Sequence, residues 1–260
     1  GTENENLPAF VVLPDERGGV FGGAMNWSNS FLPAKTQGTL LNPVGPPIVD
    51  LLPGYEISRR QQHDNLRLLN RLNERYLSSN DRNQDLLGRM RNYELAFRMQ
   101  DTVPEAMDIS QETAVTQKAY GLEDKVTLSY GKRCLMARRL VERGVRVVQL
   151  YHNRSSTASG CQIWDQHRDL KEGLIGNCAA SDRPIAGLLT DLKCRGLLDE
   201  TLVVWGGEFG RTPTAEGTNG REHHPFGFTM WMAGGGVKGG LIHGSTDEFG
   251  WYAQDDKVHV

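Results

Sequence analysis

The sequence predicts an α/β fold with a mostly parallel central sheet that helices cover on both faces. Three observations predict it: short apolar runs typical of buried strands, amphipathic stretches between the later runs, and a composition suited to a packed core. Of the 260 residues, 38% are hydrophobic and 23% are charged, as in ordinary globular domains. Near-continuous apolar strands that alternate with helices are typical of parallel sheets buried on both faces. We therefore expect one α/β domain over residues 1–260.

The N-terminal half is expected to hold one strand and three helices. The strand is a short apolar run rich in β-branched residues, and a long segment rich in glycine and proline follows it, either a surface excursion or a functional loop. Leucines at three- and four-residue spacing predict the first helix, a proline is expected to end the second, and a glycine to end the third. The predicted elements are the strand 7–13 and the helices Arg59–Leu77, Asn80 or Asp81 to Pro104, and Ser110–Tyr120.

The C-terminal half alternates between helix and strand. A helix that stops at Gly144 runs directly into an apolar strand, 145–151. Asp182 is expected to cap a further helix that carries Pro184 in its first turn and closes at Gly196. Two more apolar strands complete the predicted sheet, at 201–207 and 228–233.

The overall charge and the length of the apolar runs exclude two classes of partner. The net charge is −3, without the broad basic field that nucleic-acid binders use. No apolar run approaches the ~20 residues of a membrane-spanning helix. We therefore expect no nucleic-acid partner and no membrane span.

Carboxylates and histidines gather where the later strands end. Ligands of open α/β sheets bind beyond the carboxyl ends of the strands, and a mixture of carboxylate and imidazole is typical of divalent metal sites, with zinc first, manganese or calcium as alternatives. The alternative is that the carboxylates cap turns and the histidines lie on the surface, because no pair has the spacing of a zinc finger or an HExxH helix. The candidate metal ligands are Asp165, His167, Glu208, His223 and His224.

Arg211 and Arg221 flank the same region. A guanidinium beside a metal can bind phosphate or sulfate oxygens in a bidentate manner, so Arg211 is the candidate catalytic residue. The alternative is an ordinary structural salt bridge.

Several blocks of sequence occur in the same order along essentially the whole chain. They are Tyr93–Gln100, Ala137–Arg146, Trp164–His167, Gly207–Pro213 and Gly220–Pro225. Together they resemble one family, the bacterial domain of unknown function numbered 1501, which is abundant in planctomycetes, often labelled sulfatase-like and grouped with the alkaline phosphatase superfamily.

The resemblance implies an alkaline-phosphatase-like sheet with metals at the strand ends. It implies that Glu208 is a metal carboxylate, that Asp165 and His167 are ligands of another metal position, and that His224 is a late metal histidine. The chain departs from the family at Gln166 and Glu222, where members usually carry Thr and Asp. It also lacks the Cys-x-Pro-x-Arg signature of sulfatases that use formylglycine, so a sulfatase of that kind is not expected.

By this resemblance, we expect an exported, periplasmic or extracellular, metal-dependent hydrolase whose substrate is an anionic phosphate or sulfate ester. The alternatives are a catalytically inactive relative that binds glycans or sulfated polymers, and a structural protein of the cell envelope. We expect the chain to be a piece of a longer protein, with the nucleophile upstream of Gly1. In an exported protein, Cys161 and Cys178 are expected to pair, because both lie in a loop-rich stretch.

Overall fold

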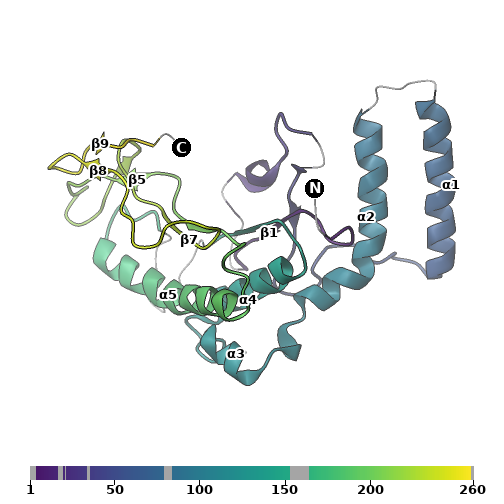
Figure 1. Ribbon diagram of the computed structural model, residues 1–260, viewed down its shortest axis with the longest axis horizontal. Helices are drawn as coiled ribbons and strands as arrows, with labels where there is room; N and C mark the ends of the chain where they lie inside the picture. Colours follow the sequence, from purple (N-terminus) through teal and green to yellow (C-terminus); the bar gives the residue numbers. More distant parts are fainter. Residues whose placement is uncertain are drawn as a thin grey trace. The chain divides into compact units, whose positions relative to one another are not determined.

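The computed structural model describes residues 4–16, 20, 22–33, 36–78, 84–152 and 164–258. The chain is a mixed α/β protein whose contacts divide it into two compact units (Figure 1). The first unit comprises Gly1–Glu112 and Leu135–Tyr151, and the second comprises Thr113–Cys134 and His152–Val260.

The first unit is built on a small parallel sheet with the strand order β2-β1-β3. Its central strand buries Val11, Val12 and Leu13 completely, as the predicted apolar run requires. The predicted passage from helix to strand near residue 144 is confirmed: α4 (Leu128–Glu142) ends before Gly144, whose φ of 84° reverses the chain into β3, a conformation that glycine adopts without strain. The strands are β1 (Phe10–Leu13), β2 (Thr39–Leu40) and β3 (Val147–Leu150).

Two long helices of the first unit lie side by side (Figure 1). The helix α1 (Arg59–Leu77) has the predicted bounds and begins at Ser58, whose hydroxyl accepts a hydrogen bond from the Gln61 amide. The helix α2 (Gln84–Met107) continues past Pro104, so the predicted end at this proline is wrong. Its last turn is retained because Val103, Ala106 and Met107 are buried in the core of the unit. The short 3₁₀ helices are η1 (Gly23–Trp27) and η3 (Ile109–Gln111).

Buried charges fix the end of α2. Arg139 donates hydrogen bonds to the carbonyls of Glu105 and Ala106, which satisfies acceptors that a helix C-terminus leaves unpaired. Glu112 forms ion pairs of 2.6 Å with both Arg138 and Arg139. Because all three side chains are at most 8% exposed, these charges stabilise the unit only as a mutually paired group.

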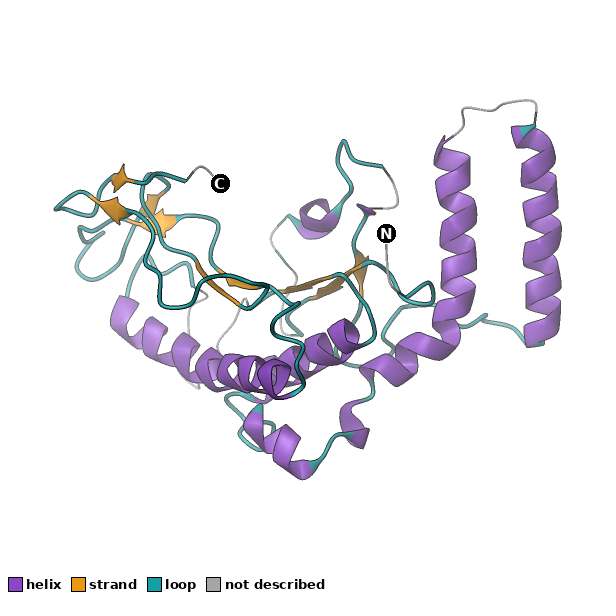
Figure 2. Cartoon of the chain, in the orientation of Figure 1, coloured by secondary structure: helices purple, strands orange, loops and turns teal. Residues whose placement is uncertain are grey.

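The described residues of the second unit form helices, among them the first part of α4, and short antiparallel strands; Figure 2 distinguishes helices and strands by colour. Its other helices are α3 (Ala114–Ala119) and α5 (Leu170–Cys194). The strand pairs are β4 (Val203–Trp205) with β7 (Trp231–Ala233), β5 (Gly210–Arg211) with β6 (His223–His224), and β8 (Ser245–Thr246) with β9 (Ala253–Asp255).

The prediction of a mostly parallel central sheet is confirmed only in part. A small parallel sheet of β1, β2 and β3 forms, whereas β4 and β7 form in the predicted runs but pair antiparallel with each other. Val204 and Met232, which pair across β4 and β7, are 48% and 53% exposed, while Trp205 and Trp231 stack with a centroid distance of 6.3 Å. One face of this ribbon is therefore partly buried and the other is exposed, as is common in antiparallel sheets. The uniformly apolar sequence of the two strands does not reveal this difference.

The helix α5 is longer than predicted. It begins at Leu170, so the expected cap at Asp182 is wrong, and Pro184 lies inside the helix. A buried face rich in small residues keeps it continuous: a Cβ on Gly187 would lie 2.7 Å from the Ala119 carbonyl oxygen. Its predicted end at Gly196 is confirmed by the φ of 71° there. Among the residues that the structure describes, no helix combines the length and apolar character that a membrane crossing needs.

Candidate metal centre

Two segments of the second unit build the candidate site: the residues that lead into α5 and the ribbon formed by β5 and β6. In the first segment, Asp165 and His167 are partly exposed, whereas Gln166 between them is 1% exposed. The buried glutamine packs against Gly173 of α5, where a Cβ would meet its amide nitrogen at 2.3 Å. Burial of the middle residue therefore leaves the two flanking side chains available to a shared site.

The pairing of β5 with β6 selects which histidine reaches this site. Arg211 lies directly opposite His223, and Gly210 lies opposite His224. Residues directly opposite each other in an antiparallel pair project from the same face, and consecutive residues of a strand project from opposite faces. Arg211 and His223 therefore reach the site together, while His224 faces away from it.

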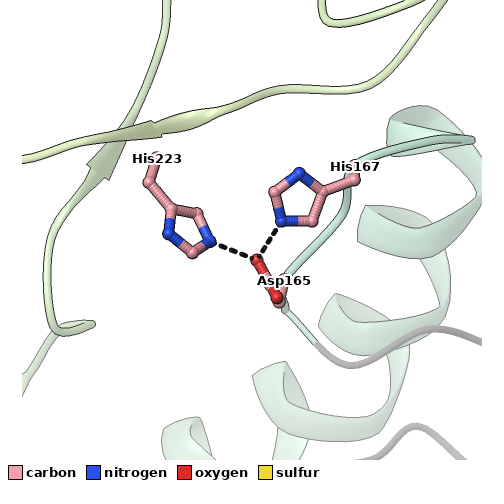
Figure 3. Close-up of side chains that lie close together, drawn as sticks. All are labelled: Asp165, His167 and His223. Atoms are coloured by element: carbon pink, nitrogen blue, oxygen red, sulfur yellow. Dashed lines mark hydrogen bonds and ion pairs between the residues drawn. The ribbon is translucent and has the colours of Figure 1, made fainter.

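Three donors converge on one oxygen, Oδ1 of Asp165. The guanidinium of Arg211 lies 2.5 Å from this oxygen. The Nε2 atoms of His223 and His167 lie 2.8 Å and 3.0 Å from it (Figure 3). Partial burial raises the pKa of Asp165, but the hydrogen bonds from Arg211 and His223 and the charge of Arg211 outweigh that effect, so its pKa lies below the ordinary value. Asp165 is thus an ionised carboxylate at the centre of a cationic cluster.

The second ring nitrogen of His167 faces further carboxylates. Its Nδ1 lies 2.6 Å from Glu216 Oε2 and 3.8 Å from Glu222 Oε1. The hydrogen bond to Glu216 is the largest influence that raises the pKa of His167, and the charges of Asp165, Glu216 and Glu222 act in the same direction. Without a bound cation, the imidazole is therefore biased towards its doubly protonated form, which donates to a carboxylate on each side.

Glu208 and His224 do not join the residues that converge on Asp165. The Glu208 side chain is 64% exposed and its carboxylate lies 3.6 Å from Arg211. His224 is 3% exposed, and its Nε2 forms a hydrogen bond with the carbonyl of Trp251 on the opposite face of the ribbon. Its ring also packs against that tryptophan, at a centroid distance of 4.9 Å. The sequence-predicted residues that the structure brings together are Asp165, His167, Arg211 and His223.

Sequence reasoning missed Glu216 as a site residue and treated Glu222 only as a departure from the family pattern. Neither carboxylate has a diagnostic spacing to His167, because their proximity depends on the path of the intervening loop. The dipeptide Asn219-Gly220 is a turn signal that indicates a tight bend in this loop. That signal could have suggested that the residues before and after the bend return to the same place.

The donor set fits a divalent cation. One carboxylate and two imidazoles, with ligand atoms within 4.8 Å of one another, form the first group: Asp165, His167 and His223. Two ligand atoms on a tetrahedral zinc ion are roughly 3.3 Å apart, so the 2.8 Å and 3.0 Å contacts would need to open only slightly. Asp165 and Glu208 lie 2.5 Å and 3.6 Å from the guanidinium of Arg211, and Glu216 and Glu222 lie beside His167. The carboxylates on both sides of the imidazole favour a cation.

A second group of three potential ligands shares His167 with the first. It comprises His167, Glu216 and Glu222. Its shortest contact, 2.6 Å between Nδ1 and Glu216, is shorter than the contacts of 2.8 Å and 3.0 Å between the imidazoles and Asp165, so it would have to open further around a cation. The first group is therefore the better candidate for a cation.

The predicted pairing of Cys161 with Cys178 stays a prediction, because Cys161 lies outside the described residues. Cys178 lies on α5, and its partial burial raises the pKa of the thiol.

The model of one protein family, described as "Protein of unknown function (DUF1501)", matches residues 1–260. Comparison with curated proteins gives no match, and comparison with solved structures gives none either.

Proposed function

The chain belongs to the DUF1501 family over its whole length, and we propose that it is a metal-dependent hydrolase of phosphate or sulfate esters. The reason is that a carboxylate, two imidazoles and a guanidinium meet in its second unit. The observation that carries the proposal is the convergence of Arg211, His167 and His223 on Asp165 Oδ1. The resemblance to the alkaline phosphatase superfamily supports the substrate class, and it supports an exported, periplasmic or extracellular location.

Asp165, His167 and His223 would hold the cation. Zinc is the preferred ion because two of the three ligands are imidazoles, with manganese or calcium as alternatives. When bound, a divalent cation polarises the ester oxygen and neutralises negative charge that develops in the transition state. The direct ion pair between Asp165 and Arg211 places a second positive charge beside this position.

Arg211 would bind the anionic ester. A guanidinium carries five N–H donors in a planar fork, and in the described contacts one nitrogen engages Asp165 while another faces Glu208 at 3.6 Å. Its side chain is 23% exposed, so it is anchored on one side and accessible on the other. This arrangement suits the binding of a nonbridging phosphate or sulfate oxygen next to the cation.

The experiment combines metal content with turnover of an aryl phosphate and an aryl sulfate by the full-length protein. We expect zinc at one or more equivalents in the wild type, and loss of both zinc and turnover in Asp165→Asn and His223→Asn. His243→Asn is the matched control, because this histidine is exposed in a different loop, and it should retain both properties.

Each of the other outcomes would overturn a part of the proposal. Zinc binding without turnover of either ester would overturn the hydrolase and favour the inactive relative that binds glycans or sulfated polymers. Absence of zinc, manganese and calcium from the wild type would overturn the metal centre and favour a structural envelope protein. Unchanged activity in Asp165→Asn would remove Asp165 from the site.

A further inference from the structure

Glu216 lies on the side of His167 that is remote from Asp165. The imidazole has one carboxylate at each nitrogen: Asp165 Oδ1 is 3.0 Å from Nε2, and Glu216 Oε2 is 2.6 Å from Nδ1. The two nitrogens of a histidine are chemically distinct, and the partner of one decides whether the other can bind a metal. The residue at Nδ1 therefore controls what Nε2 can do.

The backbone of the loop between β5 and β6 holds Glu216 in this position. Its amide and carbonyl form two hydrogen bonds of 3.0 Å with Gly220, which closes a tight bend. At the base of the loop, the Thr212 amide donates to the Glu222 carbonyl over 2.9 Å. The carboxylate of Glu216 is therefore carried by a hydrogen-bonded hairpin.

The same hairpin is fastened to the segment that carries His167. The Arg221 amide donates to the Gln166 carbonyl over 3.0 Å, and the Asp169 amide donates to the Asn219 side chain over 3.0 Å. Gly220 lies so close to His167 that a Cβ there would be 1.9 Å from the His167 carbonyl oxygen. The distance between Glu216 and the imidazole is thus fixed by backbone contacts on both sides.

From this geometry, we propose that Glu216 is a positioning residue: it accepts the Nδ1–H of His167 and so presents Nε2 as the lone-pair donor to a divalent cation shared with Asp165 and His223. The inference rests on the metal centre of the proposed function. Metal-binding histidines commonly donate their other N–H to a carboxylate, which fixes the tautomer and the ring orientation. Asp165 would then bind the cation beside Nε2, and Glu216 would accept the hydrogen bond from Nδ1 on the opposite edge of the ring.

The competing assignment makes Glu216 and Glu222 direct ligands of a cation at Nδ1. Two ligand atoms on one zinc ion are roughly 3.3 Å apart. The 2.6 Å contact between Nδ1 and Glu216 would therefore have to open further than the 2.8 Å and 3.0 Å contacts on Asp165. The two assignments also differ in what they require of Glu222. As a direct ligand, Glu222 would matter as much as Glu216, whereas in our proposal its carboxylate lies 3.8 Å from Nδ1 and interacts with Glu216, not with the cation.

The test compares zinc affinity of the full-length wild type, Glu216→Gln and Glu222→Gln, measured by competition with a chelating dye. A glutamine amide can accept from Nδ1–H or donate to Nδ1, so it keeps the volume of Glu216 but no longer selects one tautomer. We expect Glu216→Gln to weaken zinc binding by about 10- to 100-fold. Glu222→Gln removes the same charge from the same loop and should weaken it by less than about threefold, as for an exposed ion pair.

Nitrogen-15 NMR of the imidazoles provides a readout that a loss of folding alone would not produce. In the zinc-loaded wild type, His167 should show a proton on Nδ1 and a metal-bound Nε2, and in Glu216→Gln this single pattern should be lost while His223 keeps its own. Equal losses of affinity in the two variants, or no loss in Glu216→Gln, would overturn the inference. A wild type that binds no zinc would overturn it together with the metal centre, whereas zinc binding without ester hydrolysis would overturn only the proposed function.

Discussion

Arg211 and Asp165 form an ion pair of 2.5 Å on the same carboxylate oxygen that the imidazoles of His167 and His223 approach. A cation that binds this oxygen must therefore share it with a guanidinium or displace it. Arg211 consequently has two opposed effects in the proposed enzyme: it competes with the cation for Asp165, and it supplies positive charge to an anionic ester.

The variant Arg211→Met separates the effect of Arg211 on cation binding from its effect on the ester. Removal of one positive charge within contact distance of Asp165 should raise zinc affinity by roughly tenfold, while ester turnover should fall by at least about 100-fold, as for the loss of a charged group that stabilises the transition state. Arg221→Met is the control: it removes the same charge from an arginine whose guanidinium donates to the neighbouring Gly220 carbonyl and not to Asp165. Weaker zinc binding in Arg211→Met would show instead that the guanidinium holds Asp165 in its binding position.

The neighbours His223 and His224 should respond differently to the same substitution. His223→Asn removes a nitrogen that lies 2.8 Å from Asp165, so zinc binding should be lost with little change in the free energy of unfolding. His224→Asn removes a buried ring that packs on Trp251, so it should destabilise the protein by about 1–3 kcal/mol and leave zinc affinity unchanged. Chemical denaturation and metal titration of both variants measure the two effects.

A methyl group at residue 220 should disturb the centre without touching any proposed ligand. In Gly220→Ala, the new Cβ would clash with the His167 carbonyl oxygen at 1.9 Å, so the hairpin must move and the contact between Glu216 and His167 must lengthen. We expect zinc affinity to fall at least about tenfold. Gly239→Ala, where a Cβ meets no atom within 4 Å, should behave as the wild type, and unaltered zinc affinity in Gly220→Ala would contradict the packing described for this loop.

The buried ion cluster of the first unit should dominate its acid sensitivity. Burial raises the pKa of Glu112, but hydrogen bonds from Arg139 and Arg138 outweigh that effect, so its pKa lies below the ordinary value for a glutamate. A carboxyl whose pKa is lowered by folding stabilises the native state above its unfolded pKa and loses that contribution as the pH falls through the folded pKa. Glu112→Gln should therefore cost about 3 kcal/mol at neutral pH, because Arg139 loses the Glu112 carboxylate and Arg138 keeps only its ion pair with Glu142. The difference from the wild type should narrow below roughly pH 4.5.

Asp101→Asn is the control for that experiment. Its ion pair with Arg59 lies on the surface, and the Asp101 side chain is 74% exposed, so the change in stability should stay below about 1 kcal/mol at every pH. Equal effects of the two substitutions in denaturant titrations would contradict the special role of the buried cluster.

Local structure could be predicted well where one physical signal dominates. The spacing of leucines predicted α1, which has the expected bounds. Gly144 and Gly196 mark helix ends because both positions have a positive φ. The two internal prolines misled the prediction, because burial of the surrounding face kept α2 and α5 helical despite one lost hydrogen bond each. The direction of strand pairing could not be predicted, since an apolar run such as 201–207 does not specify whether its partner runs parallel or antiparallel.

The types of residue in the sequence indicated the region of the candidate site, but the register between β5 and β6 determines which residues belong to it. The mixture of carboxylate and imidazole drew attention to Asp165, His167 and His223, which the structure brings together. It could not separate His223 from His224, because that choice depends on which of them lies opposite Arg211. Glu216 could not be selected either, since its contact with His167 depends on backbone hydrogen bonds made by other residues of the loop.

The pairing of Gly210 with His224 has a consequence for how this loop can change in evolution. Where loop length sets the register, deletion of one residue between the two strands would place His224 opposite Arg211, whereas insertion of one residue would place Glu222 there. In both cases His224 would lie on the face of Asp165 and His223 on the face of Trp251. Insertion or deletion of two residues would preserve the sidedness of β6. Homologues with working sites should therefore differ in this loop by even numbers of residues, or should carry the second histidine at a compensating position.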